Sequence, residues 1–256
     1  MTRGLWNRET VALLLLAAML PLAVTWLLSA GIAGLSRLVF VLVAAGFWHL
    51  VFMLARAQPP SFSGVLSALA IAMLAPLDLG PLPLLLGVSF GVVAGELVFG
   101  GWGRNVVHPA AVALAFLGFG FPLAPWPDLP VQLGWAAGAV AFLGVVLGVM
   151  PWRVLAGGAA MLAAAHGLAF APPVLTAAAV ALVLLAADPA TSAATRLGRW
   201  LNGLLYGALV LLFAYGWEGA APVRIAVSAA MLATLAAPLL DELAISLWLA
   251  RRKRLG

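Results

Sequence analysis

The sequence predicts an all-α integral membrane protein with ten transmembrane helices, arranged as two inverted five-helix repeats with both termini in the cytoplasm. Three observations predict this fold class: the composition, the number of apolar segments and the placement of basic residues. Of the 256 residues, 65% are hydrophobic and only 8% are charged, with a mean hydropathy of +1.16, whereas a soluble domain has about one quarter charged residues. We therefore expect a single membrane domain over residues 1–256.

Apolar segments run along the whole chain and set the number of crossings. A helix that crosses the hydrocarbon core needs about 20 residues at a rise of about 1.5 Å each. The ten segments are 10–33, 38–55, 62–77, 83–99, 107–121, 130–150, 152–170, 173–187, 200–216 and 225–249. Three of them, 62–77, 107–121 and 173–187, are too short for a straight crossing, so we expect them to tilt, break or stop part-way.

Basic residues orient these segments. If the N-terminus is inside, only Arg37 and Arg224 lie outside, which is a strong positive-inside bias. The cytoplasmic set is Arg3, Arg8, Arg56, Arg104, Arg153, Arg196, Arg199, Arg251, Arg252, Lys253 and Arg254. The basic residues thus report orientation, and we expect contact with the lipid bilayer and no nucleic-acid partner.

Prolines and aspartates bracket short apolar segments at similar positions in the two halves of the chain. Pro59 and Pro60 precede one short segment and Pro172 and Pro173 another, while Asp78 and Asp188 follow those segments. The offset is close to 113 residues and contains five spans, so a second copy would be inverted. This divides the chain into repeats of about 10–121 and 130–250, a pattern that points to a site near the midplane. Chance self-similarity of Ala- and Leu-rich sequence is the alternative.

Polar residues inside apolar segments are candidates for function because they are costly in lipid. His49, His108 and His166 all lie in or beside such segments. A b-type haem would need two of them on facing helices, and a neutral histidine bonded across helices is the simpler interpretation, so haem is not expected. Glu96 is a candidate proton or ion ligand.

Two acids near the C-terminus are a further candidate of this kind. We favour the interpretation that Asp241 and Glu242 are membrane-edge acids facing the basic tail 251–254. The chain has no cysteine and no P-loop, dinucleotide fingerprint or HExxH motif. Catalytic residues therefore stay unknown, no metal site is expected, and a redox group would be held by the membrane portion or by partners.

Two long motifs resemble one family. The run VVAGELVFGGWGRNVVHPAAVALAFLGFGFP is similar to the FGGxGxNxFNPA…FP signature of the RnfD/NqrB family, the membrane subunits of the Rnf complex and of the sodium-pumping NADH:quinone reductase. LLAADPATSAATRLGRW is similar to that family's DPVTSPxTxKGRW, PWRV resembles SWRIP, and AAPLLDEL resembles the APLID ending. The resemblance covers most of the chain from about Ser61 onward.

The resemblance implies a function as well as a fold. It implies two inverted five-helix repeats similar to urea transporters, and other membrane and redox subunits as partners in an electron-transfer complex of the bacterial inner membrane. Such complexes couple redox chemistry to Na⁺ or H⁺ movement, so the chain is expected to be an accessory, multi-pass subunit of a membrane oxidoreductase. A non-covalent flavin or a quinone at the repeat interface is left open.

The family's covalent FMN site is missing. Members carry FMN on a Thr in a D-x-x-S/T-G-A-T motif after the fifth helix, but residues 122–129, PLAPWPDL, contain neither Thr nor Ser. The stretch from Asp188 to Thr195 lacks the motif's Gly, so we expect no covalent FMN on Thr191 or Thr195. His108 replaces the second Asn of the family signature.

The site candidates follow from the motifs and the intramembrane polar residues. They are Asn105, His108, Asp188, Thr191, Ser192, Thr195, His49 and Glu96. The plain structural interpretation is that the motif residues bond exposed backbone near broken helices. The alternative functions are a transporter or channel for a small solute or an ion and, third, a b-type haem protein.

Overall fold

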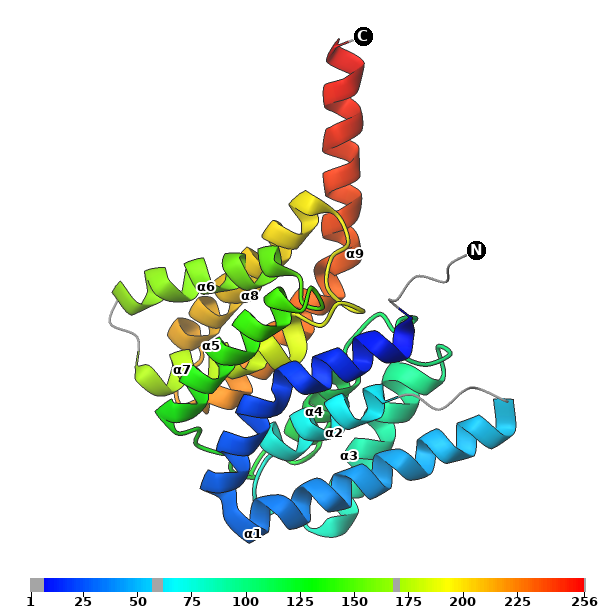
Figure 1. Cartoon of the computed structure of the whole chain (residues 1–256). Helices are drawn as coiled ribbons and strands as arrows, with labels where there is room; N and C mark the ends of the chain where they lie inside the picture. Colours follow the sequence, from blue (N-terminus) through cyan, green and yellow to red (C-terminus); the bar gives the residue numbers. More distant parts are fainter. Residues whose placement is uncertain (1–6, 57–61, 168–170, 256) are drawn as a thin grey trace.

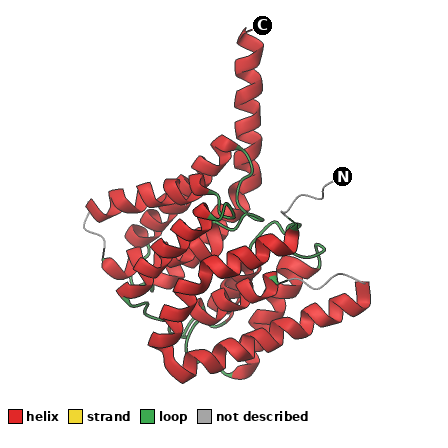
Figure 2. Cartoon of the chain, in the orientation of Figure 1, coloured by secondary structure: helices red, strands yellow, loops and turns green. Residues whose placement is uncertain are grey.

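The computed structural model describes residues 7–56, 62–167 and 171–255, and all the regular secondary structure in these ranges is helical (Figures 1 and 2). Nine α-helices and two π-helical segments make up the described chain. They are α1 (Arg8–Arg56), α2 (Ser63–Leu74), α3 (Pro81–Val92), η1 (Val93–Leu97), α4 (Pro109–Gly120), α5 (Val131–Val146), α6 (Trp152–Gly167), α7 (Pro172–Ala181), η2 (Leu182–Ala186), α8 (Arg196–Gly216) and α9 (Pro222–Leu255).

Helix α1 contains the first two expected segments, which is why ten segments yield nine helices in the described chain. The helix is broken at Gly31, where φ is 61° and ψ is −147°, and the ribbon turns back on itself at one corner of the bundle (Figure 1). Glycine adopts this conformation at little cost because it lacks a Cβ atom. The break lies before the gap expected at 34–37, since the second limb starts earlier than its apolar run.

Three helices in the described part of the chain are long and apolar enough to cross a membrane by length and composition. They are α1, α8 and residues Pro222–Arg252 of α9, and the other helices are apolar but shorter. Together with the composition, they identify an all-helical, membrane-embedded protein.

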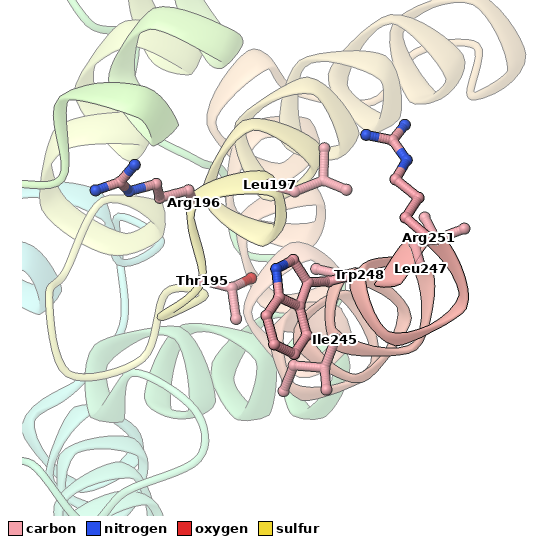
Figure 3. Close-up of a pocket in the computed structure, with 8 residues that line it drawn as sticks. Thr195, Arg196, Leu197, Ile245, Leu247, Trp248 and Arg251 are labelled. Carbon is pink, nitrogen blue, oxygen red and sulfur yellow. The ribbon is translucent and has the colours of Figure 1, made fainter. Parts of the chain in front are cut away.

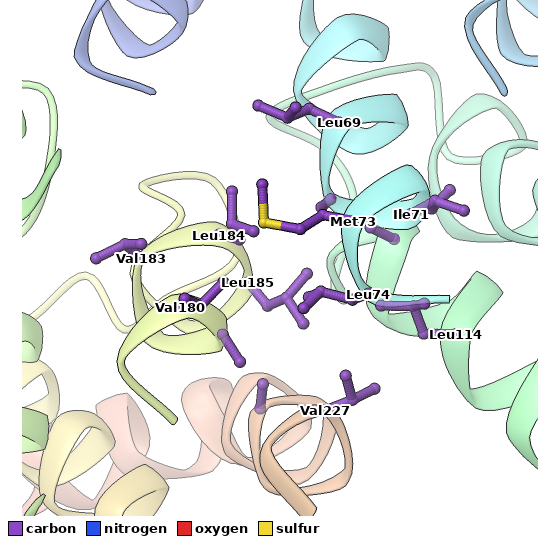
Figure 4. Packing of buried hydrophobic residues seen from close by; sticks show 14 of the residues in the cluster. Leu69, Ile71, Met73, Leu74, Leu114, Val180, Val183, Leu184, Leu185 and Val227 are labelled. Atoms are coloured by element: carbon purple, nitrogen blue, oxygen red, sulfur yellow. The ribbon is translucent and has the colours of Figure 1, made fainter. Parts of the chain in front are cut away.

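Two short helices form the centre of the bundle. Side chains of α2 and of α7–η2 point toward one another between α4 and α9, with Leu74 and Leu185 both fully buried (Figure 4). Both helices are apolar on all sides, which is typical of helices that other helices surround. Beside α2, Arg37 of α1 donates from Nη2 to the carbonyl oxygens of Ala75 and Pro76 at 2.8 and 2.6 Å. The end of the short helix is thereby hydrogen-bonded.

Small residues let several helices approach closely. A Cβ atom at Gly91 of α3 would lie 2.6 Å from the carbonyl oxygen of Pro109, at the start of α4. A Cβ at Gly203 of α8 would overlap the carbonyl oxygen of Val154 in α6. Such contacts are typical of helix packing in membranes, where backbones meet at small residues. Helix α4 also packs against α9, and α1 against α2, α3 and α5.

Helix α9 leaves the bundle at its C-terminal end (Figure 1). Beyond Pro238, large apolar side chains are exposed, including Leu239 at 68% and Trp248 at 56%. The guanidinium of Arg252 lies 5.3 Å from the centre of the Trp248 ring. An exposed helix that is apolar on several sides is suited to lipid or to a partner protein.

Candidate functional site

Two loops that are distant in sequence meet beside the start of α1. The first loop, residues 98–108, follows η1, and the second loop, residues 187–195, follows η2. Both line a cavity of about 530 Å³, the first with Trp102 and Arg104, the second with Pro189 and Ala190, and Arg8 of α1 joins them. Single π-helical turns occur frequently at functional sites, and here one precedes each loop.

The first loop holds its shape through its own residues. Gly100, Gly101 and Gly103 have φ values of 101°, 90° and 88°, which favour glycine because a Cβ atom would be strained. Asn105 accepts a hydrogen bond from the N–H of Gly103 at 3.0 Å and donates to the carbonyl of Val107 at 3.2 Å. Asn105 therefore bonds exposed backbone, as the sequence indicated.

His108 ends the first loop and begins α4. Its Nδ1 accepts a hydrogen bond from the N–H of Ala110 at 3.2 Å, and Pro109 occupies the first helical position. The side chain is buried. His108 therefore acts as the N-cap of α4, a position usually taken by Asn, Asp, Ser or Thr.

Glu96 lies inside η1 and is fully buried. Its Oε1 accepts a hydrogen bond from the hydroxyl of Ser63, the first residue of α2, at 2.9 Å. Its Oε2 has no hydrogen-bond partner in the described part of the chain. A buried carboxylate with a free oxygen is costly unless a proton, a cation or water is close to it.

Glu96 is within electrostatic range of Arg8 and Asp188, and each of these is also within range of one histidine. Arg8 interacts electrostatically with Glu96 and with His49, while Asp188 interacts with Glu96 and with His108. The Nε atom of Arg8 and the Nε2 atom of His49 are also buried without a hydrogen-bond partner among the described residues. Buried polar atoms are normally hydrogen-bonded, so three free ones in a single cluster indicate a place for water or an ion. We call these five residues the polar cluster.

The second loop is folded around Asp188. The carboxylate accepts a hydrogen bond from the hydroxyl of Thr191 at 3.1 Å, and the Asp188 carbonyl accepts one from the N–H of Ser192 at 3.0 Å. Asp188 and Thr191 are both buried. The loop motif therefore combines a structural turn with one carboxylate of the polar cluster.

Thr195 lies at the start of α8, away from the polar cluster. It caps α8 by accepting from the N–H of Gly198 at 3.0 Å, and its own hydroxyl donates to Asp241 of α9 at 2.6 Å. Asp241 also accepts from the backbone N–H groups of Ala194 and Thr195 at 2.7 and 2.8 Å. The expectation that Asp241 faces the basic tail is therefore wrong. The match of AAPLLDEL to a family motif was the signal that could have found this contact.

A second cavity lies beside Thr195, between α8 and α9. Its volume is about 320 Å³, and Arg196, Trp248 and Arg251 are among the residues around it (Figure 3). A third cavity, of about 280 Å³, lies where α4, α8 and α9 meet and is lined by Phe213, Trp126 and Trp217. Arg224 also lines it and stacks 4.7 Å from the centre of the Trp217 ring. This aromatic cavity thus offers aromatic rings and one guanidinium to a ligand.

The structure thus separates the predicted residues into groups. Glu96, His108, Asp188 and His49 belong to the polar cluster. Asn105, Thr191 and Ser192 shape the two loops, whereas Thr195 faces Asp241. The sequence analysis did not identify Arg8 as a member of the cluster, because it used Arg8 only as one of the basic residues that orient the helices. His166 lies in α6, and its side chain is outside the described part of the structure.

Comparisons with known proteins relate the chain to one family. The sequence model of the "NQR2, RnfD, RnfE family" matches residues 6–132. Relatives named as a subunit of Na(+)-translocating NADH-quinone reductase include those of Stutzerimonas stutzeri, 26% identical, and Pseudomonas aeruginosa, 29% identical, each over 82% of this chain and 66% of the relative. The Klebsiella pneumoniae protein with the same name is 26% identical over 84% of this chain and 67% of its own length.

The chain therefore spans about two thirds of the length of these relatives. The family match includes η1 and the first loop, and the longer alignments cover most of the remaining chain. With the two loop motifs and the apolar helices, these matches identify the chain as a member of the NQR2, RnfD, RnfE family.

Proposed function

We propose that this chain is a membrane subunit of a bacterial inner-membrane electron-transfer complex, and that its polar cluster forms part of a path for Na⁺ or H⁺. The observation that carries the proposal is Glu96, a fully buried carboxylate with one unpartnered oxygen among the described residues, where the two loops meet. Relatives named as subunits of a Na(+)-translocating NADH-quinone reductase support the assignment to such a complex.

The chemistry of the cluster suits a monovalent cation or a proton. Carboxylate and hydroxyl oxygens of Glu96 and Ser63 are hard oxygen ligands, and Asp188 adds a second negative charge nearby. The positive charge of Arg8 limits how strongly the site can hold a cation. A site that binds moderately can also release, which passage through a membrane requires.

The test uses inverted membrane vesicles from cells that express the chain with the products of its neighbouring genes. We expect Glu96→Gln to lower substrate-driven Na⁺ or H⁺ uptake at least tenfold, because the amide keeps the shape and loses the charge. Glu242→Gln is the matched control, since Glu242 is exposed on α9, and uptake should stay within twofold of the native protein. Unchanged uptake in the Glu96 variant would contradict the ion path.

The arrangement we propose has ten crossings in two inverted five-helix repeats. The break at Gly31 divides α1 into two limbs, and packing partners recur, with α3 against α4 and α8 against α9. Likewise α2 packs on α4 as α7 packs on α9. The start of α1 and both loops share one cavity, which supports placing them all on the cytoplasmic side.

Labelling of single cysteines tests this topology, because the native chain has none. Leu123 is 97% exposed between α4 and α5, and Arg251 is exposed near the end of α9. A membrane-impermeant maleimide should label Leu123→Cys in intact spheroplasts and Arg251→Cys only in inverted vesicles. Labelling of both from the same side would refute the proposed crossings.

The chain is proposed to carry no covalent FMN. Residues 122–129 connect α4 to α5 and contain no hydroxyl side chain that could form the phosphoester. A non-covalent flavin or a quinone ring fits the aromatic cavity, where Trp126 and Trp217 would stack on it and Arg224 could donate hydrogen bonds to its oxygens. Denatured protein should show no in-gel flavin fluorescence, and a fluorescent band would reject the proposal. A Soret band in the native spectrum would instead support the haem alternative.

A transporter or channel for a small solute or an ion is the second candidate. The polar cluster favours it to the same extent, because nothing in its side-chain chemistry requires a redox group. Purification separates the two functions: a redox complex should retain partner subunits, whereas a transporter should purify as a solitary oligomer. The transporter function further requires that liposomes containing the protein take up ions or urea-like solutes faster than empty liposomes do.

A further inference from the structure

The cavity between α8 and α9 has an unusual combination of linings. Arg196 and Arg251 lie on either side of it, with the Trp248 ring between them (Figure 3). Aliphatic side chains, among them Leu197 and Ile245, form most of the remaining wall. The cavity therefore offers two cations and an aromatic ring above an apolar surface.

Neither cation has a counter-charge in the described part of the chain. Arg196 and Arg251 form no ion pair or side-chain hydrogen bond there. Asp241, on the same helix as Arg251, is already engaged, because it accepts three hydrogen bonds from Ala194 and Thr195. The residues that line the cavity thus include two cations and no acid, since Asp241 lies behind Thr195 and is not part of the lining.

The surroundings of the cavity are apolar and exposed. Leu239, Leu243 and Leu247 are 68%, 49% and 45% exposed on the projecting part of α9. In a membrane protein such a surface lies in lipid or against a partner, and the run of basic residues that follows marks the level of the headgroups. Tryptophan is enriched at the same level.

We infer that this cavity binds an anionic phospholipid. The lipid phosphate binds to the guanidinium of Arg251, since guanidinium groups form strong, paired hydrogen bonds with phosphate oxygens. The Arg196 side chain points away from Arg251 (Figure 3) and attracts the anionic headgroup from the other side of the cavity. Trp248 packs at the level of the glycerol backbone, and the acyl chains follow Leu197, Ile245 and the exposed leucines of α9. The projecting end of α9 is therefore a lipid-binding element.

Native mass spectrometry of the detergent-purified full chain tests the inference with two defined lipids. Palmitoyl-oleoyl phosphatidylglycerol should be retained at least tenfold better than palmitoyl-oleoyl phosphatidylcholine, because only the former carries a net charge. The double variant Arg196→Gln with Arg251→Gln should lose at least tenfold of this retention, and each single variant part of it. Equal retention of the two lipids, or undiminished retention in the double variant, would overturn the inference.

Arg252→Gln is the matched control for general attraction to the basic tail. Arg252 neighbours Arg251 and stacks on Trp248, but it does not line the cavity. Retention in this variant should stay within twofold of the native chain. A loss as large as that caused by Arg251→Gln would show that tail charge alone attracts the lipid. Protection of this surface by a co-purified protein would likewise reject a lipid occupant.

Discussion

The first loop and the second loop occupy matching places but are held by different means. Each follows a π-helical segment and ends at a residue that caps the next helix, His108 for α4 and Thr195 for α8. The first loop is bonded by its own residues, as Asn105 shows. The second depends in addition on Asp241, which is distant in sequence. One half of the site is thus set locally, whereas the other requires α9 to be in place.

The largest effect on stability is expected where the second loop is tied to α9. Asp241→Ala removes the acceptor for the N–H groups of Ala194 and Thr195 and for the Thr195 hydroxyl. Hydrogen bonds to a charged group contribute about 1.5–3 kcal/mol each, and partial exposure limits the total, so we expect a loss of about 2–3 kcal/mol. Chemical unfolding in detergent measures it.

Glu242→Gln controls for the removal of an acid from α9. Glu242 is exposed and bonds to no other described residue, so a change within about 0.5 kcal/mol is expected. Equal losses in the two variants would mean that the second loop is as self-contained as the first.

The next effect concerns the glycines of the first loop. Gly101→Ala forces a side chain into φ 90° and toward the Arg8 guanidinium, 2.7 Å from the new Cβ, for which we expect a loss of about 2 kcal/mol. Gly103 has φ 88° but no atom near its Cβ position. Gly103→Ala should therefore cost only the backbone strain, about 1 kcal/mol. If the two variants were equally stable, the Arg8 contact would have no influence on the loop.

A smaller effect is expected at the cap of α4. His108→Ala leaves the N–H of Ala110 without its acceptor and should lower the free energy of unfolding by about 1 kcal/mol. His108→Asn restores an oxygen acceptor of the kind preferred at N-caps, so its stability should return to that of the native chain. Failure of Asn to rescue the cap would assign His108 a role that depends on the imidazole itself.

The smallest contrast lies within the second loop. Thr191→Ala removes the hydroxyl that donates to Asp188, which is expected to cost about 1 kcal/mol. The Ser192 side chain bonds to no other described residue, since only its backbone N–H reaches the Asp188 carbonyl. Ser192→Ala should thus stay within about 0.5 kcal/mol of the native chain. A larger loss for Ser192 than for Thr191 would contradict the description of this loop.

The sequence predicted the positions of the helices better than it predicted the contacts between their polar side chains. Residues 62–77 and 173–187 are too short for a straight crossing and were expected to tilt, break or stop part-way, and they correspond to the short helices α2 and α7–η2. The segments 10–33 and 38–55 placed a break at residues 34–37, and the structure has it slightly earlier, at Gly31. The polar cluster was foreseen only as separate residues, since its members come from distant elements. Arg8 and Asp241 acquire their roles through tertiary contacts that no local pattern records.

The turn at Gly31 has a consequence for how the two limbs of α1 are joined. A single glycine joins the two long apolar limbs, so no separate loop connects them. Arg37 follows the turn closely in sequence, and its guanidinium donates hydrogen bonds to the carbonyl oxygens of Ala75 and Pro76. In the arrangement proposed above, the two limbs of α1 form one helical hairpin, and α2 packs against it.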